Sequence, residues 1–149
     1  MKKHLIFGLA AVLFFTSIAV AQDIPQSQVP AEVVSSFQKA FPDARDVEWE
    51  MDGNLYKVEF EIGMRQLDHD AWYNDAGQLL KHQEEISKNS LPKQVAAGVK
   101  QEFKGYRIED VEKITEGDKV TYKLEVKSSM EEWKLTLDSN GKVLTKVAD

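Results

Sequence analysis

Residues 29–33 have the sequence Val-Pro-Ala-Glu-Val, and residues 91–95 have the matching sequence Leu-Pro-Lys-Gln-Val. Proline is favoured in the first turn of a helix, where its missing N–H costs no hydrogen bond. Apolar residues then recur at helical spacing in both segments, at Val33, Val34, Phe37, Ala40 and Phe41 and at Val95, Ala96, Val99 and Phe103. Each segment is therefore predicted to be an amphipathic helix, ended by Pro42 in one case and by Gly105 in the other.

After each helix the apolar residues recur at every second position, which is typical of strands with one covered face. This alternation is clearest in two stretches, residues 56–62 and residues 120–126, and each follows a glycine-containing hairpin turn. Third strands are expected at about residues 66–73 and 131–137, and fourth strands at about 78–86 and 142–147. Each half therefore predicts one helix followed by four strands.

The two halves predict an α+β fold made of two tandem repeats, each a helix followed by four antiparallel strands. The first repeat is expected to span residues 22–86 and the second residues 87–149, with a short polar linker, Ser87-Lys88-Asn89-Ser90, where they meet. A unit of about 60 residues buries too little apolar surface to be stable alone. We therefore expect one continuous sheet with both helices packed on the same face.

The N-terminal segment predicts export. Lys2 and Lys3 are followed by an apolar run and by Ala19-Val20-Ala21, which is the order of regions in a secretory signal peptide. Residues 1–21 are expected to be removed after Ala21, with an uncleaved anchor as the alternative. The sequence contains no cysteine, which argues against a lipid-modified cysteine, disulfides and thiolate metal sites. The mature protein is expected to be periplasmic or secreted, without stable membrane insertion.

The charge and the motif content narrow the function. The formal net charge is −6 at pH 7, and the predicted signal peptide contributes only basic charges, so the mature chain is more acidic still. Such a chain repels nucleic acid phosphates and anionic lipid, and no nucleic acid partner is expected. Phosphate-binding loops, zinc-ligand spacings, dinucleotide glycines and a nucleophile elbow are missing from the sequence. We expect no enzyme and no cofactor.

The strand alternation places polar side chains and one tryptophan on the face opposite the helices. If Gly63-Met64 is a two-residue turn, then Leu55 faces Trp72, Lys57 faces Asp70 and Glu59 faces Asp68. Aromatic side chains on a polar surface are common binding hot spots. We predict that this open face binds a protein of the cell envelope through Trp72, Leu55, Lys57, Glu59, Asp68 and Asp70. The alternative role of Trp72 is to cover the edge of the core with Leu55.

Two other functions remain open. Glu59, Asp68 and Asp70 carry oxygen ligands of the kind that Ca²⁺ prefers, so the strand pair could bind calcium or a small ligand. A solvated acidic strand, with Lys57 neutralising Asp70, explains the same residues without a metal. A free sheet edge could instead pair with another chain in a structural role.

The remaining aromatic and histidine residues are predicted from the same alternation. Trp49 and Trp133 share a phase with apolar neighbours and are expected in the core. His69 is expected to point toward the core, away from the acidic strand pair, and His82 is expected to stand alone.

The closing segments of the two halves carry a family resemblance. Asn74-Asp75-Ala76-Gly77-Gln78-Leu79-Leu80 and Asp138-Ser139-Asn140-Gly141-Lys142-Val143-Leu144 resemble the strand, turn, glycine and strand that end PepSY-like units. Residues 56–60 and 122–126 resemble the aromatic-rich middle strand of that group. The resemblance covers about residues 26–147 and implies the tandem fold of the beta-lactamase inhibitor protein.

The resemblance also implies a function. It suggests a secreted or periplasmic binding module, in some relatives an inhibitor or regulator of proteases or other enzymes, and it implies no catalytic residues. This sequence lacks the cysteines of the disulfide-bearing inhibitor, so the resemblance does not identify an inhibitory target.

Overall fold

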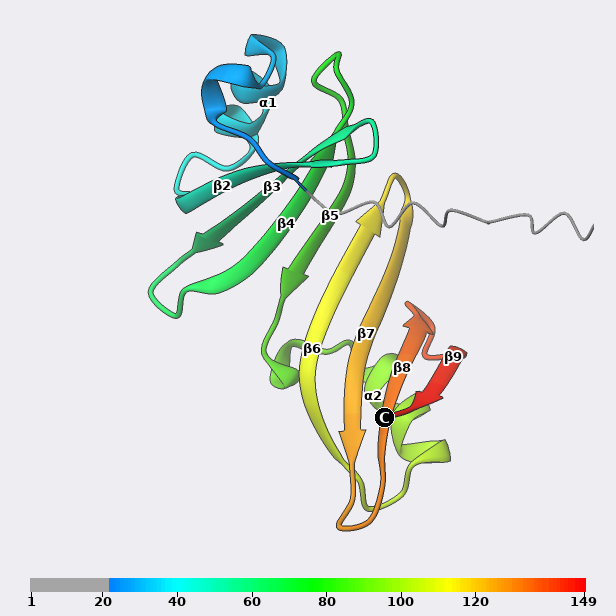
Figure 1. Cartoon of the computed structure of the whole chain (residues 1–149). Coiled ribbons are helices and arrows are strands. Elements are labelled where there is room, and N and C mark those ends of the chain that lie inside the picture. The colour runs from blue at the N-terminus through cyan, green and yellow to red at the C-terminus, as the bar shows by residue number, and fades with distance from the viewer. Residues whose placement is uncertain (1–21) are drawn as a thin grey trace, which may run out of the picture.

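The computed structural model describes residues 22–149, and the predicted signal peptide, residues 1–21, lies outside that range. The described chain folds into two α-helices and a nine-stranded antiparallel sheet, in which the order of the strands follows their order in the sequence (Figure 1). The predicted α+β fold with one continuous sheet is confirmed.

Each repeat has the same order of elements. The first contains the short edge strand β1 (Gln22–Asp23), helix α1 (Ala31–Ala40) and the strands β2 (Arg45–Asp52), β3 (Leu55–Ile62), β4 (Leu67–Tyr73) and β5 (Leu79–Glu85). The second contains helix α2 (Lys93–Glu102) and the strands β6 (Arg107–Glu116), β7 (Lys119–Lys127), β8 (Glu132–Asp138) and β9 (Val143–Ala148). A single 3-10 turn precedes each helix, at Gln26–Gln28 and at Lys88–Ser90. Among these elements, β1 and the two 3-10 turns were not predicted.

The prolines that were expected to begin the two helices lie at the N-caps. Pro30 is the N-cap of α1 and Pro92 is the N-cap of α2, so each helix begins one residue after its proline. Val33 and Phe37 are buried on α1, and Val95 and Val99 are buried on α2. Each helix therefore buries one apolar stripe, as the spacing predicts.

Both helices cover the same face of the sheet. Directly paired residues on neighbouring strands project to the same side. The register links Val58, Ala71 and His82 of the first repeat to Thr115 and Val120 of the second. Val58 and Ala71 belong to the core under α1, and Val120 packs against the core under α2. The prediction of a common helix face is thus confirmed.

The apolar side chains form two cores, one for each repeat. Trp49 is 4% exposed in the first core, and Trp133 packs against the second, so both tryptophans lie where they were expected. The first core contains Val29, Val33, Phe37, Trp49, Val58, Phe60, Ala71 and Tyr73. The second contains Leu91, Val95, Val99, Phe103, Val111, Tyr122, Leu124, Val126, Leu135 and Leu137.

The closing turn of each repeat rests on its helix. Gly77 and Gly141 have φ angles of 76° and 87°, in the region that favours glycine. A Cβ atom at Gly141 would lie 2.1 Å from the Gln94 carbonyl oxygen, and a Cβ atom at Gly98 would lie 1.9 Å from the Gly141 carbonyl oxygen. In the second repeat, the turn and α2 therefore approach so closely that neither position admits a side chain.

The predicted pairing of β3 with β4 is wrong by two residues. Residues 63–66 form a four-residue loop instead of a two-residue turn, with positive φ at Gly63 and Gln66 and a 3.3 Å hydrogen bond from the Gln66 amide to the Gly63 carbonyl. Lys57 consequently faces Trp72, and Glu59 faces Asp70. Because the slip is an even number of residues, each side chain keeps its predicted face.

Candidate functional site: an acidic groove on the open sheet face

The open face of the sheet has carboxylates at its centre. Two adjoining hollows share Asp68, Asp70 and Glu112. We call the two together the acidic groove, and their nine carboxylate residues are Asp46, Glu48, Glu59, Glu61, Asp68, Asp70, Glu85, Asp110 and Glu112. No lysine or arginine of the described chain lines either hollow.

A bulge from each repeat contributes to the groove. The segments Asp46-Val47-Glu48 and Asp110-Val111-Glu112 repeat the same three residues, and the strand register breaks at both. Asp46 and Asp110 have φ angles of 48° and 45°, in the left-handed region that aspartate tolerates better than most residues. The groove is thus built by both repeats and extends across the β5–β6 pairing that joins them. The prediction missed these residues, although the repeated Asp-Val-Glu segment was visible in the sequence.

The groove carries negative charge that its own residues do not neutralise. Within residues 22–149, the Glu61 Oε2 atom is buried and accepts no hydrogen bond. Burial raises the pKa of the Asp70 carboxyl, the Lys57 ammonium opposes this shift, and neighbouring Glu59 adds to it. A buried carboxylate oxygen without a partner carries a desolvation cost. A cationic group that entered the groove would remove part of that cost.

Lys57 lies beside the groove, and acidic neighbours already hold its charge. Its Nζ atom is 2.8 Å from Glu50 Oε1 and 3.7 Å from Asp70 Oδ1, and it also pairs with Glu59. Burial alone would lower the pKa of Lys57, but the hydrogen bonds to Glu50 and Glu59 and the charge of Asp70 outweigh it and raise that pKa. Lys57 therefore stays charged and fixed, and forms part of the frame of the site.

Trp72 lies on the open face, as predicted, but most of its ring is covered. The residue is 8% exposed, and its indole Nε1 donates a 2.8 Å hydrogen bond to Asp52 Oδ2. The Nζ atoms of Lys81 and Lys57 lie 4.2 Å and 5.5 Å from the ring centroid, within the range of cation–π attraction. Trp72 and Leu55 do not line the acidic groove. Trp72 is thus held in place by its neighbours and does not offer a bare aromatic surface.

Of the two predictions about histidines, the one for His69 is correct and the one for His82 is wrong. His69 points to the helix-covered face and is 8% exposed, as expected. The expectation that His82 stands alone is wrong, because His82 Nε2 lies 3.1 Å from His69 Nδ1. The pairing of β4 with β5, which the sequence did not define, places His69 opposite Glu84 and puts His82 on the same face. The two rings meet edge to edge in nearly parallel planes, with an interplanar angle of 8°.

The predicted calcium ligands do not form a compact group. Glu59, Asp68 and Asp70 all lie in the groove, but they are not a set whose oxygens converge on one point. Among residues 22–149, the group of three possible ligands whose atoms lie within 4.8 Å of one another is His69, His82 and Glu84. The three residues of the calcium alternative therefore lie on one surface, and they are not among the grouped ligand atoms.

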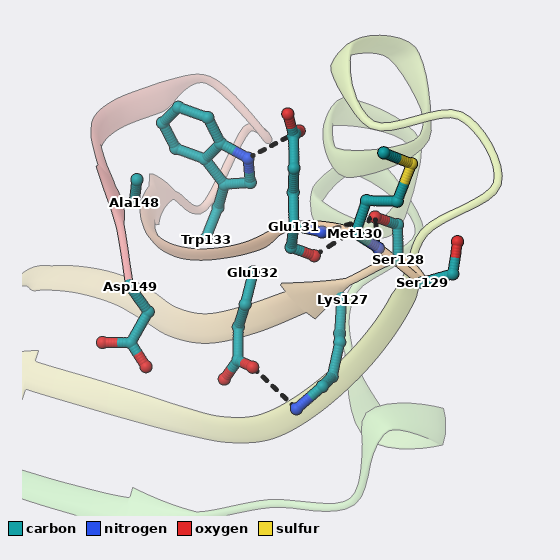
Figure 2. A pocket seen from close by; sticks show the side chains of 9 residues that line it. All are labelled: Lys127, Ser128, Ser129, Met130, Glu131, Glu132, Trp133, Ala148 and Asp149. Carbon is teal, nitrogen blue, oxygen red and sulfur yellow. Dashed lines mark hydrogen bonds and ion pairs between the residues drawn. The ribbon is translucent and has the colours of Figure 1, made fainter.

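A different hollow surrounds the β7–β8 loop (Figure 2). Its polar groups are paired within the protein: Trp133 Nε1 and the Tyr106 hydroxyl donate to Glu131 Oε2 at 3.4 Å and 2.7 Å, and Lys127 pairs with Glu132 at 2.6 Å. Met130, in this loop, is 92% exposed, and Met64 in the β3–β4 loop is fully exposed. Because its polar groups are already satisfied, this hollow is a weaker candidate than the acidic groove.

Comparison with known proteins identifies the family. The chain matches the family model described as "Putative beta-lactamase-inhibitor-like, PepSY-like" over residues 18–81 and 56–145. The chain belongs to the PepSY-like family. In this PepSY-like protein, the first match ends in β5 of the first repeat, and the second runs from β3 of the first repeat to β9 of the second. No match was found among curated proteins.

Several crystal structures share the fold of this PepSY-like protein. A DUF2874 family protein from Bacteroides ovatus is 19% identical with a TM-score of 0.67, over 80% of this chain and 86% of that one. A "putative periplasmic" protein from Bacteroides eggerthii is 17% identical with a TM-score of 0.69, over 80% and 88% of the two chains. A BLIP-like protein from Bacteroides fragilis is 17% identical with a TM-score of 0.66, over 84% and 87%. These likenesses support the fold.

No helix within residues 22–149 has the length and apolar character needed to cross a bilayer.

Proposed function

We propose that this PepSY-like protein is an exported, non-catalytic binding module that holds a basic segment of a cell-envelope protein in the acidic groove. Its effect would be to inhibit or regulate that partner, a protease or another enzyme. The observation that carries the proposal is the set of nine carboxylates that line the groove without a lysine or arginine among them.

The electrostatics of the groove define the chemistry of the partner. A surface lined by one sign of charge attracts a partner of opposite charge at long range and speeds encounter. Glu48, Glu59 and Asp68 are exposed and available for direct contact. Glu61, with its buried unpaired oxygen, would gain a partner from a lysine or arginine side chain that reached the floor of the groove.

The predicted partner-binding residues take two roles in this proposal. Glu59, Asp68 and Asp70 line the groove and would contact the partner. Lys57 and Trp72 fix the neighbouring surface through the ion pairs and the indole hydrogen bond, and Leu55 is half-buried beside them. Trp72→Ala is therefore a poor test of binding, because it would remove a supporting ring and change stability at the same time.

The shape of the site favours binding over catalysis. Enzyme sites shift the pKa of their acids and exclude water inside enclosed pockets. The acidic groove lies on the open face of a sheet, and no serine, threonine or cysteine of residues 22–149 lines it. The fold of a BLIP-like protein, shared at a TM-score of 0.66, is consistent with a binding role.

Export is the second part of the proposal. The predicted signal peptide, residues 1–21, lies outside the described residues, but a structural relative is described as periplasmic. A pulse-chase experiment that follows the mass of the protein in the periplasmic fraction would test it. We expect loss of residues 1–21 on export, and retention of the full-length chain in the membrane fraction would contradict it.

The binding proposal is tested by removing charge from the groove alone. The triple variant Glu48→Gln, Glu59→Gln and Asp68→Asn changes three exposed groove residues. The matched control Asp75→Asn, Glu116→Gln and Asp118→Asn changes the same number of exposed carboxylates in turns and strand ends away from the groove. Immobilised wild type should retain a basic envelope protein at low salt and release it at high salt.

The outcomes separate the binding hypotheses. We expect the groove variant to lose at least about tenfold in affinity for the captured partner while the control keeps it. Equal capture by both variants would overturn the groove as the binding site. The same series repeated with and without millimolar calcium separates a basic partner from a cation, because bound calcium would raise the thermal midpoint of the wild type but not of the groove variant. Solution scattering at several concentrations tests the structural alternative, in which a sheet edge pairs with another copy.

A further inference from the structure

On the helix-covered face, two histidines and a glutamate lie together where the two repeats meet. His69 comes from β4, and His82 and Glu84 come from β5, which pairs with β6 of the second repeat. One ligand atom from each of the three lies within 4.8 Å of the other two. His69 also lines one of the two hollows of the acidic groove, whereas His82 and Glu84 line neither of them.

We propose that His69, His82 and Glu84 form a binding site for a divalent transition-metal ion, of which Zn²⁺ is the best fit. Two imidazoles and one carboxylate are a common zinc ligand set, with water in the fourth position. Imidazole nitrogen also suits copper and nickel, whereas calcium and magnesium prefer oxygen ligands alone.

The distance between the two rings fits a shared metal ion. Two nitrogens bound to zinc at about 2.0–2.1 Å in tetrahedral geometry lie about 3.3 Å apart. His69 Nδ1 and His82 Nε2 are 3.1 Å apart, which is close to the required separation. The ring centroids are 5.4 Å apart, so the two nitrogens face each other along one line, and the rings must turn before both lone pairs point at one ion. In the metal-free protein the two nitrogens share one hydrogen. One ring must therefore move its hydrogen to its outer nitrogen when the ion enters, with no net loss of a proton from the pair.

Aromatic rings pack beside both imidazoles. Phe60 stacks on His69 with ring centroids 5.2 Å apart, and Phe41, the C-cap of α1, lies 4.9 Å from His82. The C-terminal end of a helix carries partial negative charge, which favours a cation beside it.

Lys113 provides an outer partner for the carboxylate. Its Nζ atom lies 3.0 Å from Glu84 Oε1, which leaves the other carboxylate oxygen for the ion. Metal-binding carboxylates are commonly held by such a second group. Lys113 belongs to β6, so a bound ion would link residues of the first repeat, through Glu84, to the second.

The corresponding positions of the second repeat show that the fold does not require this cluster. The β8–β9 pairing places Trp133 opposite Ala148, where the β4–β5 pairing places His69 opposite Glu84. Lys146 takes the position of His82. The same backbone is therefore built without any of the three ligands, which argues for a role beyond folding.

The test uses the intact protein, freed of metal by chelation, with Zn²⁺ as the ligand and Co²⁺ as a spectroscopic probe. At a zinc concentration 100 times Kd, we expect the thermal midpoint to rise by about 5–10 °C. His82→Asn and Glu84→Gln should each weaken binding at least about tenfold. The matched control is Glu85→Gln, because Glu85 is the next residue on β5 and projects to the opposite face.

Three results would overturn the proposal. The first is a thermal midpoint that zinc does not change. The second is an equal rise of the midpoint in the wild type and in His82→Asn. The third is a rise that is lost in Glu85→Gln but kept in Glu84→Gln. If the His82 variant does not fold, imidazole NMR of the wild type decides. His69 and His82 are the only histidines after residue 21, and the ring signals of both must shift with zinc. The groove variant Glu48→Gln, Glu59→Gln and Asp68→Asn should keep the full zinc response, so failure here and failure of the groove proposal are distinguishable.

Discussion

The two repeats share the order of one helix and four strands and carry different side chains at matched positions. In the first repeat, Glu50, Lys57, Trp72 and Lys81 pair in a row across β2 to β5. In the second repeat, the row across β6 to β9 that contains Thr136 is Glu112, Lys123, Thr136 and Thr145. Trp72 and Thr136 are equivalent, because each precedes the register shift beside its closing turn. Both rows begin with a Glu–Lys pair, and only the first continues with an indole and a second lysine.

The comparison separates what makes the fold from what is added to it. Both repeats keep the bulge at an aspartate and the turn glycine that rests on the helix. The indole on the open face and the histidine pair on the covered face occur only in the first repeat. The shared features act through the backbone, so they define the fold, whereas the unshared side chains are candidates for function.

The largest loss of stability is expected when Trp72 of the first repeat is replaced by threonine, the residue at the equivalent position of the second repeat. Trp72→Thr removes a ring that is 8% exposed together with its hydrogen bond to Asp52. Loss of a buried tryptophan ring should lower the free energy of unfolding by about 3 kcal/mol. Urea denaturation would measure it, with Thr136→Ala as the matched change, expected to cost less than about 1 kcal/mol. Equal losses would mean that the indole is not specific support for the first repeat.

A second change tests the contact between the closing turn and the helix. Gly98→Ala in α2 would gain about 1 kcal/mol of helix propensity on an exposed helix. Here the new Cβ would meet the Gly141 carbonyl oxygen at 1.9 Å, so we expect a net loss of about 2 kcal/mol from overpacking.

The matched position in α1 is Ser36, which lies beside Gly77. Ser36→Ala keeps the Cβ that the first repeat already accommodates, so its thermal midpoint should stay within about 2 °C of the wild type. A stabilised Gly98→Ala variant would show that the two turns contact their helices in the same way.

A third change concerns a buried hydroxyl that the second repeat lacks. The Tyr73 hydroxyl is buried and has no hydrogen-bond partner in the described chain, whereas Leu137 occupies the equivalent position. Tyr73→Phe should be stabilising at neutral pH by about 1 kcal/mol, because it removes an unsatisfied polar group. Tyr73→Leu, which copies the second repeat, separates loss of the hydroxyl from loss of the ring.

The same tyrosine predicts a pH dependence. Burial raises the pKa of Tyr73 from 10.0 to about 12. The unfolded chain therefore releases the phenol proton at lower pH than the folded protein. The stability that the neutral phenol contributes is complete below pH 10 and is lost as the pH rises toward 12. Thermal midpoints measured across this range should fall less steeply in Tyr73→Phe, and parallel curves would contradict the assignment.

The smallest loss of stability is expected from a substitution of Lys81, the second lysine in the row of the first repeat. Lys81 Nζ lies 4.2 Å from the Trp72 ring centroid, and Lys81→Gln should remove about 0.5 kcal/mol of cation–π attraction. Thr145→Lys installs a lysine at the matched position, where the neighbour is Thr136 and no indole is present. Thr145→Lys should not measurably raise the free energy of unfolding in a urea titration. A gain as large as the loss in Lys81→Gln would show that the indole ring is not the partner of Lys81.

The fold was predictable from the sequence because its signals are periodic and occur twice. The prolines at 30 and 92, the change from helical to alternating spacing and the matched turn glycines gave both helices, the order of the strands and the faces of the sheet. The pairing of β3 with β4 was wrong because the loop length depends on the left-handed backbone of Gly63 and Gln66, which alternation does not reveal. Because the register error was an even number of residues, each side chain was predicted on the correct face of the sheet but opposite the wrong cross-strand neighbour.

The candidate site was predicted only in part. Glu59, Asp68 and Asp70 follow from alternation along one hairpin, and all three line the groove. Asp110 and Glu112 come from the other repeat, so their place in the groove depends on the pairing of β5 with β6. The contact of His69 with His82 likewise depends on the register of β4 with β5. Pairing between strands whose connecting turn does not fix the register is what the sequence alone could not supply.

The exposed thioethers of Met64 and Met130 have a chemical consequence. Both lie in hairpin loops, one in each repeat, and the chain has no cysteine to react with oxidants first. Oxidation of methionine to the sulfoxide makes the side chain polar, which disrupts a core but changes little at a solvated tip. Bleach or peroxide that reaches the protein would therefore react first at two loop ends, while both cores stay intact.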